Sequence, residues 1–276
     1  MFTLNCKGRL LVVDKPIVMG IINITPDSFF EGSRFGEEEE ILSQAEKMLR
    51  EGATLLDIGA QSTRPQSQRI SQEEELRRAI PGINAIRDHF PEAILSIDTY
   101  YSRVALEAVE AGASMINDIS AGQLDNRMMQ TAAHLNVPYI CMHMKGTPDT
   151  MQQEAQYENI TREVLDFLIC RVEDCRLAGI TDIIIDPGFG FGKTIAHNFE
   201  LLKNLAVFDM LQKPVLVGLS RKSTIYRTLD ITAAEALNGT TVVNSIALMN
   251  GASILRVHDV KEAVEAIKLF EAYQSS

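Results

Sequence analysis

Three polar residues that follow short aliphatic runs have the chemistry to recognise a flat heterocycle. They are Asp98, Asn117 and Asp186. A carboxylate can accept two hydrogen bonds from a planar N–C–N donor edge, and an amide offers one donor and one acceptor. Together the three suit a flat ring better than a sugar. The alternative is that each residue caps the next helix, as Asp and Asn often do, but this explanation is less economical for all three at once.

A second polar group suits an anion. The segment 220–223 (Ser-Arg-Lys-Ser) follows one apolar run, and the segment 256–259 (Arg-Val-His-Asp) ends the last run. Arg256 and His258 are two residues apart, so in a strand both point to the same side. With Asn23 at the end of the first run, they form a candidate seat for pyrophosphate and Mg²⁺, because Mg²⁺ beside substrate phosphates uses few protein ligands. A structural role is the alternative for His258.

Two polar loops follow the first and second apolar runs. The segments 23–30 and 59–65 are rich in hydroxyl groups, and the second contains Arg64. An Arg with nearby hydroxyls and backbone N–H groups suits a phosphate or a carboxylate. An ordinary turn of Pro, Asp and Ser is the alternative.

The glycine-rich segment 187–194 fails two familiar motifs. A phosphate-binding P-loop needs Gly where Pro187 stands, and a dinucleotide fingerprint needs Gly where Lys193 stands. We interpret the segment as a flexible loop that presents Phe189 and Phe191 to an aromatic ligand. Two core phenylalanines on a tight turn are the alternative.

Other chemistry receives little support. The sequence has no Ser-His-Asp order, no H-E-x-x-H motif and no His/Cys zinc cluster, so a covalent nucleophile is not indicated. We interpret His143 as a structural residue, whereas Met142 beside it is a candidate to pack against the ligand.

The spacing of the apolar runs predicts where these residues meet. Continuous apolar strands that alternate with helices indicate a parallel sheet covered on both faces. Eight such units predict a closed (β/α)8 TIM barrel, whose active site lies at the carboxyl ends of the strands. The predicted strands are 16–23, 55–59, 93–99, 115–120, 138–143, 182–188, 214–220 and 254–259.

Helices are expected between the strands, and a short β-hairpin in residues 1–15 is expected to close the bottom of the barrel. Pro81 predicts a kink or break in its helix. No linker or composition break divides the chain, so residues 1–276 are predicted to form one domain. The expected helices are 38–51, 72–89, 102–111, 124–136, 157–178, 197–211, 232–250 and 260–273.

Composition narrows the class of protein. A net charge of −11 argues against nonspecific binding to nucleic acid or anionic membranes, and 46% hydrophobic residues suffice for a large core. The four cysteines form no C-x-x-C pair, which indicates reduced thiols in the cytoplasm. Neither a signal-peptide core nor a run of 18 apolar residues is found.

At these residues the chain resembles the dihydropteroate synthase family over nearly its full length. Seven ordered blocks make the resemblance specific, although no single block does. The blocks are 23–29, 62–65, 96–99, 117–120, 186–193, 220–223 and 256–259.

The resemblance implies condensation of 6-hydroxymethyl-7,8-dihydropterin pyrophosphate with para-aminobenzoate in a (β/α)8 barrel, and it suggests a cytoplasmic homodimer. It places the pyrophosphate and Mg²⁺ at Asn23, Arg256 and His258. The pterin would lie against Asp98, Asn117, Met142, Asp186, Lys222 and Arg256, and para-aminobenzoate against Thr63, Arg64, Pro65, Phe189 and Ser223. Sulfonamides would compete with para-aminobenzoate for its site. An SN1-like course follows from a stabilised leaving group and a pterin cation near Asp98 and Asp186.

Two departures from the family pattern stand out. The acid of the first loop is Glu31, where the family usually has Asp, and Gln61 replaces a common Glu. Two other functions stay open. A pterin-binding barrel that transfers a methyl group from methyltetrahydrofolate would share the pterin contacts but needs no pyrophosphate seat. A non-catalytic pterin-binding paralogue would be favoured by loss of Asn23, Arg64, Lys222 or His258, and all four are present.

Overall fold

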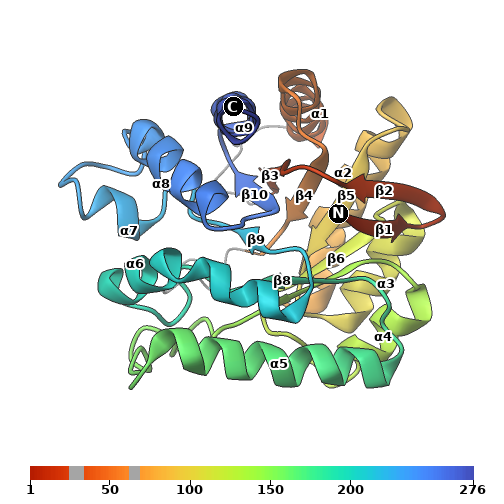
Figure 1. The fold of residues 1–276 in the computed structure, drawn as a ribbon. Helices are drawn as coiled ribbons and strands as arrows, with labels where there is room; N and C mark the ends of the chain where they lie inside the picture. Colours follow the sequence, from red (N-terminus) through yellow and green to blue (C-terminus); the bar gives the residue numbers. More distant parts are fainter. Residues whose placement is uncertain (25–33, 62–68) are drawn as a thin grey trace.

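The protein, described here as a computed structural model over residues 1–24, 34–61 and 69–276, alternates strands and helices along the chain (Figure 1). The strands are β1 (Phe2–Cys6), β2 (Arg9–Val13), β3 (Ile17–Asn23), β4 (Leu55–Gly59), β5 (Ile94–Asp98), β6 (Met115–Asp118), β7 (Tyr139–Met142), β8 (Ile183–Asp186), β9 (Leu216–Val217) and β10 (Ile254–Val257). The helices are α1 (Arg34–Glu51), α2 (Gln72–His89), α3 (Ser102–Ala111), α4 (Met128–Leu135), α5 (Ile160–Ala178), α6 (Ile195–Lys203), the 3-10 helix η2 (Leu205–Leu211), α7 (Ser223–Tyr226), α8 (Leu237–Met249) and α9 (Val260–Gln274).

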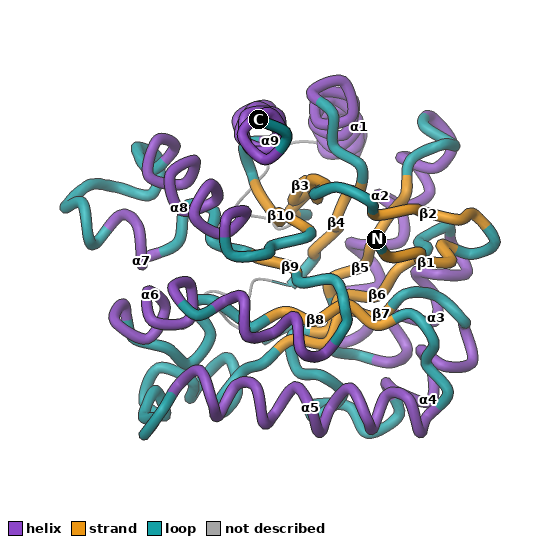
Figure 2. Tube along the Cα trace, viewed as in Figure 1, coloured by secondary structure: helices purple, strands orange, loops and turns teal. Residues whose placement is uncertain are grey.

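Eight parallel strands form a nearly closed barrel inside a ring of helices (Figure 2). Their order is β8-β7-β6-β5-β4-β3-β10-β9. A parallel bridge between Ile185 and Val215 joins the two ends, and the Ile185 N–H donates to the Pro214 carbonyl at 3.0 Å. The predicted (β/α)8 barrel is therefore confirmed. The seventh strand is shorter than predicted, with only Leu216–Val217 in the ladder, and Pro214 at the start of the predicted range has no N–H to donate.

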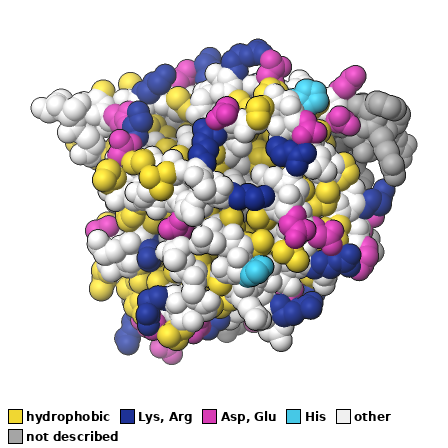
Figure 3. Space-filling view, turned by 90° about the vertical axis from the view of Figure 1, so that its right-hand side faces the viewer, with side chains coloured by type: hydrophobic (Ala, Val, Ile, Leu, Met, Phe, Trp, Pro, Cys, Tyr) yellow, Lys and Arg dark blue, Asp and Glu magenta, His cyan; other side chains and the backbone are white. Residues whose placement is uncertain are grey.

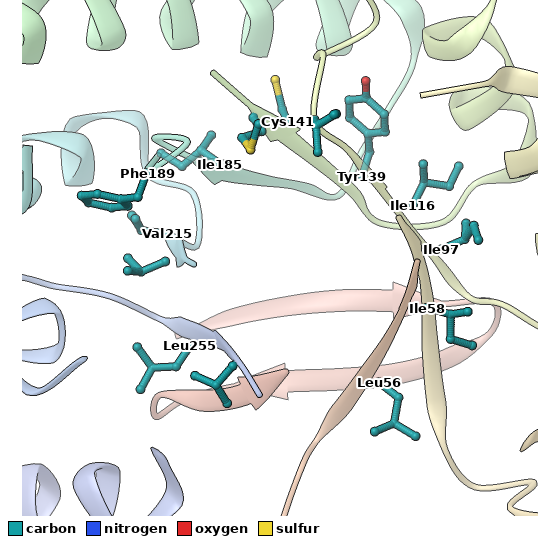
Figure 4. Packing of buried hydrophobic residues seen from close by; sticks show 14 of the residues in the cluster. Leu56, Ile58, Ile97, Ile116, Tyr139, Cys141, Ile185, Phe189, Val215 and Leu255 are labelled. Carbon is teal, nitrogen blue, oxygen red and sulfur yellow. The ribbon is translucent and has the colours of Figure 1, made fainter. Parts of the chain in front are cut away.

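The outward faces of the strands build the core beneath the helices. Successive side chains of a strand point to opposite faces, so every second side chain packs outward against the helical ring (Figure 4). The buried outward residues include Leu56, Ile58, Ile97, Ile116, Tyr139, Cys141, Ile185 and Leu255.

The inward faces form two layers of different chemistry. The lower layer is apolar and includes Leu55, Ile94, Met115, Ile140, Ile184 and Ile254. The β1–β2 hairpin packs Leu4, Cys6 and Val13 against this layer, which confirms the expected closure of the barrel bottom. Two residues further along, five of the strands place a polar residue inward: Asp57, Ser96, Asn117, Asp186 and Arg256. The alternation therefore gathers polar groups above an apolar plug.

Several helix predictions need correction. Pro81 does not break α2, which continues from Gln72 to His89. Its two halves bury Leu76, Ile83 and Ile86 against the same core, so packing outweighs the lost hydrogen bond. Helices α4, α5 and α8 begin 3 to 5 residues later than predicted, the predicted helix 197–211 divides at Asn204 into α6 and η2, and α7 was not predicted.

The outer surface carries no feature of a membrane span in the described residues, because no helix there is both long and apolar enough. On the right-hand side of Figure 1, basic and acidic side chains are interspersed (Figure 3). The four cysteines are free, as predicted, and only Cys170 is exposed. Burial raises the pKa of the Cys6 thiol to about 12, so this thiol is unreactive at neutral pH.

Candidate active site

Arg256 lies at the centre of a charged network inside the barrel. Its Nε donates to Oδ2 of Asp57 at 2.6 Å, and its Nη2 donates to Oδ2 of Asp98 at 2.7 Å. The amide of Asn117 donates to the same oxygen of Asp57 at 2.9 Å. These residues come from β10, β4, β5 and β6. The barrel therefore brings Asp98, Asn117 and Arg256 together, as the sequence predicted.

Asp57 is the functional candidate that the sequence prediction missed. It is 0% exposed, and its Oδ1 has no hydrogen-bond partner in the described part of the chain. The predicted site residues lie at or beyond the ends of strands, whereas Asp57 lies within the run LLDIG. The available signal was a carboxylate inside a fully buried strand, because such a group requires partners. Its unpaired oxygen can accept a hydrogen bond from a ligand.

The network is electrostatically constrained. Burial raises the pKa of Asp98 to about 7, the Arg256 guanidinium opposes that shift, and Asp57 and Asp118 add to it. Burial alone would lower the pKa of Arg256, but the carboxylates of Asp57 and Asp98 raise it above its ordinary value. The guanidinium therefore stays charged and is the cation that holds the two carboxyl groups together.

Asp186 and Lys222 form the neighbouring part of the site. The Gly188 N–H donates to Oδ1 of Asp186 at 2.7 Å. Burial raises the pKa of Asp186, and Lys222 is the main group that opposes this shift. The Lys222 ammonium donates to the Phe189 carbonyl at 2.5 Å and lies 4.7 Å from the centre of the Phe191 ring. Burial lowers the pKa of Lys222 to about 8, against the attraction of Asp186 and Asp98.

His258 and Asn23 lie at the rim, where the neighbouring parallel strands β10 and β3 end: Asn23 is the last residue of β3, and His258 directly follows β10. The exposed His258 ring has Nδ1 3.0 Å from the Ser220 hydroxyl, and the same hydroxyl accepts the His258 backbone N–H at 3.2 Å. The Asn23 amide oxygen lies beside Gly59, 3.6 Å from where a Cβ would stand there. The described residues contain no cluster of three or more His, Cys, Asp or Glu that could hold a metal ion.

Arg221 does not join the predicted anion seat. Its guanidinium makes two hydrogen bonds of 2.8 Å to the Asp259 carboxylate and two more to the carbonyls of Ala233 and Ala234. A guanidinium engaged in this bidentate pair is already satisfied. Arg221 therefore braces the segment before α8, while Lys222 is the basic residue of this motif that faces the site.

Phe189 is also oriented differently from the prediction. Its ring is 1% exposed and packs in the outer core near Ile185 and Val215 (Figure 4). Gly188 causes this turn, since it has φ of 72° and any Cβ would meet the His143 carbonyl oxygen at 1.8 Å. The prediction that this loop presents the Phe189 ring to a ligand is therefore wrong, because the ring is buried and only the Phe189 carbonyl contacts Lys222. Met142 is buried at the end of β7.

Part of the predicted arylamine site lies outside the described residues. Thr63, Arg64 and Pro65 belong to that part, as does Glu31 of the first loop. Ser223 is half-buried at the start of α7, next to Lys222. Gln61, the other departure from the family pattern, accepts the Ile70 N–H on its side-chain oxygen at 3.0 Å. A neutral amide can fill that role because the contact needs only an acceptor.

Known proteins similar to this chain share its fold and much of its sequence. Residues 19–258 match the family described as "Pterin binding enzyme". The dihydropteroate synthase of Haemophilus influenzae is 43% identical over 271 residues, which cover 98% of both chains. The Yersinia pestis dihydropteroate synthase, solved with a sulfonamide drug complex, superposes with a TM-score of 0.93 at 40% identity and covers 100% of both chains. The Xanthomonas albilineans dihydropteroate synthase in complex with 7,8-dihydropteroate has a TM-score of 0.90 at 38% identity, again with full coverage.

A parallel barrel with a buried Asp–Arg–Asp network, together with the family match over most of its length, defines a pterin-binding barrel enzyme. The similarity over nearly the whole chain narrows the class further. The chain belongs to the dihydropteroate synthase family, transferases of folate biosynthesis. This similarity favours the synthase over the methyltransferase alternative.

Proposed function

We propose that this chain condenses 6-hydroxymethyl-7,8-dihydropterin pyrophosphate with para-aminobenzoate and releases 7,8-dihydropteroate and pyrophosphate. The observation that carries the residue assignment is the network of Asp57, Asp98 and Asn117 around Arg256. Its buried acceptors and its amide suit the donor and acceptor edge of a flat pterin. The complex of the Xanthomonas relative with 7,8-dihydropteroate supports the substrate class.

The pterin would lie between this network and the Asp186–Lys222 pair. Asp186 has one oxygen bound to the Gly188 N–H, which leaves the other for a ligand donor. Lys222 would donate a hydrogen bond to the pterin from the opposite side, since its ammonium is attracted to the carboxylates of Asp186 and Asp98. Met142 would line this pocket, and Arg256 would stack beside the ring.

The pyrophosphate would lie at Asn23, Arg256 and His258. The residues fit a substrate-carried Mg²⁺, because Asn23 offers one hard oxygen ligand at the rim and the described chain builds no multi-acid cage. When bound there, Mg²⁺ would neutralise charge that develops on the leaving pyrophosphate. His258, held by Ser220, would donate to the same group.

The arylamine would lie near Thr63, Arg64, Pro65 and Ser223, beside the loop of Phe189. Arg64 is the natural partner for the para-aminobenzoate carboxylate, because a guanidinium and a carboxylate pair through two parallel hydrogen bonds. Sulfonamides would compete for this position. The similar Yersinia enzyme has been solved with a sulfonamide drug complex, which supports the assignment.

An SN1-like course is the mechanism that this charge distribution favours. Departure of pyrophosphate leaves a cationic pterin, and the carboxylates of Asp98 and Asp186 stand beside the pterin position. The arylamine is nucleophilic when neutral and needs no strong base. Deuterium on the reacting methylene should give a normal secondary isotope effect on kcat/KM for the pterin substrate. A value near unity, with chemistry shown to limit the rate, would argue for concerted displacement.

Purified protein mixed with Mg²⁺, the pterin pyrophosphate and labelled para-aminobenzoate should form labelled 7,8-dihydropteroate. Leaving out Mg²⁺ should lower the rate sharply, because the leaving group would keep its full charge. Chromatographic separation of the labelled product measures the reaction. Lack of product, under conditions in which a relative such as the Haemophilus influenzae enzyme is active, would reject the proposed activity.

A homodimer through α8 and α9 is proposed from their exposed apolar side chains. A groove of about 280 Å³ between these helices is lined by Met249, Ala266, Leu269, Phe270 and Tyr273, among others. Leu269 is 73% exposed, and contiguous apolar surface of this kind marks interaction sites. Leu269→Glu should therefore convert the dimer to a monomer, as measured by light scattering after gel filtration.

The matched control is Leu177→Glu. Leu177 is 70% exposed near the end of α5, on another side of the barrel (Figure 1), and its replacement should leave the dimer intact. A wild-type chain that is monomeric at micromolar concentration would refute the dimer.

A cytoplasmic location is proposed as well, because the cysteines are free thiols and thiols stay reduced in that compartment.

A further inference from the structure

Lys193 is a buried lysine for which the proposed mechanism has no use. It is 4% exposed, and its ammonium lies behind the loop that follows β8. The Nζ atom is 2.8 Å from Nδ1 of His143 and donates to the carbonyls of Gly188 at 2.8 Å and Phe191 at 3.0 Å. The His143 carbonyl lies at 3.4 Å. Lys193 thus ties the end of β7 to both ends of the loop.

The loop 188–191 is held between two lysines. Gly188 and Phe191 turn their carbonyls back to Lys193, whereas Phe189 turns its carbonyl forward to Lys222. Gly188 and Gly190 have φ of 72° and 85°, which allow these alternating directions. The same loop supplies the Gly188 N–H that orients Asp186. Any displacement of the loop would therefore move a carboxylate and an ammonium of the pterin site together.

The polar contacts of Lys193 stabilise its charged form against the cost of burial. Three backbone carbonyls and one imidazole nitrogen direct negative ends of dipoles at Nζ. Burial and the neighbouring Lys193 lower the pKa of His143 to about 2, so the ring is neutral and Nδ1 acts as the acceptor. Burial and the Lys222 ammonium lower the pKa of Lys193 well below its ordinary value, and the Asp186 carboxylate opposes that shift.

We propose that Lys193 is a positioning residue for pterin binding, whose buried ammonium clamps the loop after β8 and supplies positive charge behind Asp186. This inference rests on the proposed function, since it concerns the pterin site. The charged groups that act on Asp186 are Lys222 from the segment after β9, Arg256 from β10 and Lys193 itself. His143, from the end of β7, is neutral.

The test compares Lys193→Met, Lys193→Arg and wild type in calorimetric titrations with 6-hydroxymethylpterin between about pH 5 and 8. Asp186 accepts hydrogen bonds only as a carboxylate, so binding weakens as pH falls through its pKa. Loss of the Lys193 charge raises that pKa further. In Lys193→Met this acid limb should move up by about one pH unit, so that affinity on the acid side of the limb falls by up to about tenfold relative to wild type, while Lys193→Arg should keep the wild-type limb.

Lys145→Met is the control, because the Lys145 charge also acts on His143, but its ammonium points outward to Glu163 and the Tyr157 ring. It should leave the limb unchanged. A limb in folded Lys193→Met that coincides with wild type would overturn the proposal. If Lys193→Met does not fold, nitrogen-15 spectra of lysine-labelled wild type decide, with the signal assigned from Lys193→Arg: an ammonium at pH 7 supports the proposal, and a neutral amine refutes it. Failure of wild type to bind the pterin would instead count against the proposed function.

Discussion

Lys222→Ala should reduce kcat/KM for the pterin pyrophosphate by at least about 100-fold, the size of loss that follows removal of one buried charge-stabilising donor. The side chain is the ammonium that interacts electrostatically with the carboxylates of Asp186 and Asp98. It also fixes the loop through the Phe189 carbonyl. Its loss would remove a ligand donor and free that loop. Steady-state kinetics with the pterin substrate varied at saturating para-aminobenzoate measure the effect.

The pH profile adds a readout that a purely structural role would not change. The pKa of Lys222 is lowered to about 8, and the charged form exists below that value, so wild-type kcat/KM should fall as pH rises through about 8. That basic limb should be absent in Lys222→Ala. The matched control is Lys261→Ala, because Lys261 is exposed on α9 and pairs only weakly with Glu265 at 3.9 Å. Near-normal turnover by Lys222→Ala, or an unchanged basic limb, would show that the assigned role is wrong.

The barrel was predictable because its strands carry a simple signal. Runs such as those around Ile97 and Ile185 are apolar on both faces, as strands buried between a barrel interior and helices must be. The positions of Asp98, Asn117 and Asp186 at the ends of such runs then place them on one rim. That reasoning needs no side-chain detail, and this is why it reached most of the proposed pterin site.

The parts that the sequence did not reveal depend on contacts between distant residues. Asp57 joins the candidate site only because the barrel places β4 where Asn117 of β6 and Arg256 of β10 both donate to its carboxylate. The prediction for Phe189 fails because an aromatic side chain in a glycine-rich loop can face either a ligand or the core, and the sequence does not show how closely the Gly188 backbone approaches His143. Arg221 looked equivalent to Lys222 until its pairing with Asp259 was seen.

Arg256→Met should lower the free energy of unfolding by about 3 kcal/mol or more and abolish pterin binding, since removing one partner of a buried ion pair leaves uncompensated charge. Its guanidinium is the hydrogen-bonded cation between Asp57 and Asp98, whose side chains are 0% and 11% exposed. Without Arg256 the pKa of Asp98 would rise further in the folded protein. Such a group favours folding at low pH and loses that contribution as pH rises through its folded-state pKa. The deficit should therefore be small near pH 4 and largest above pH 7, as measured by denaturant unfolding at each pH.

Two further variants separate lost charge balance from lost packing. Adding Asp57→Asn to Arg256→Met removes one of the two uncompensated carboxylates, so the double variant should regain about 1 kcal/mol or more at neutral pH while pterin binding stays lost. Arg103→Met breaks an exposed pair with Glu107, in which the side chains are 51% and 39% exposed, and should cost less than about 1 kcal/mol. A double variant no more stable than Arg256→Met, or a deficit independent of pH, would mean that Arg256 stabilises the barrel by packing and that the charged network is not what holds the pterin site in place.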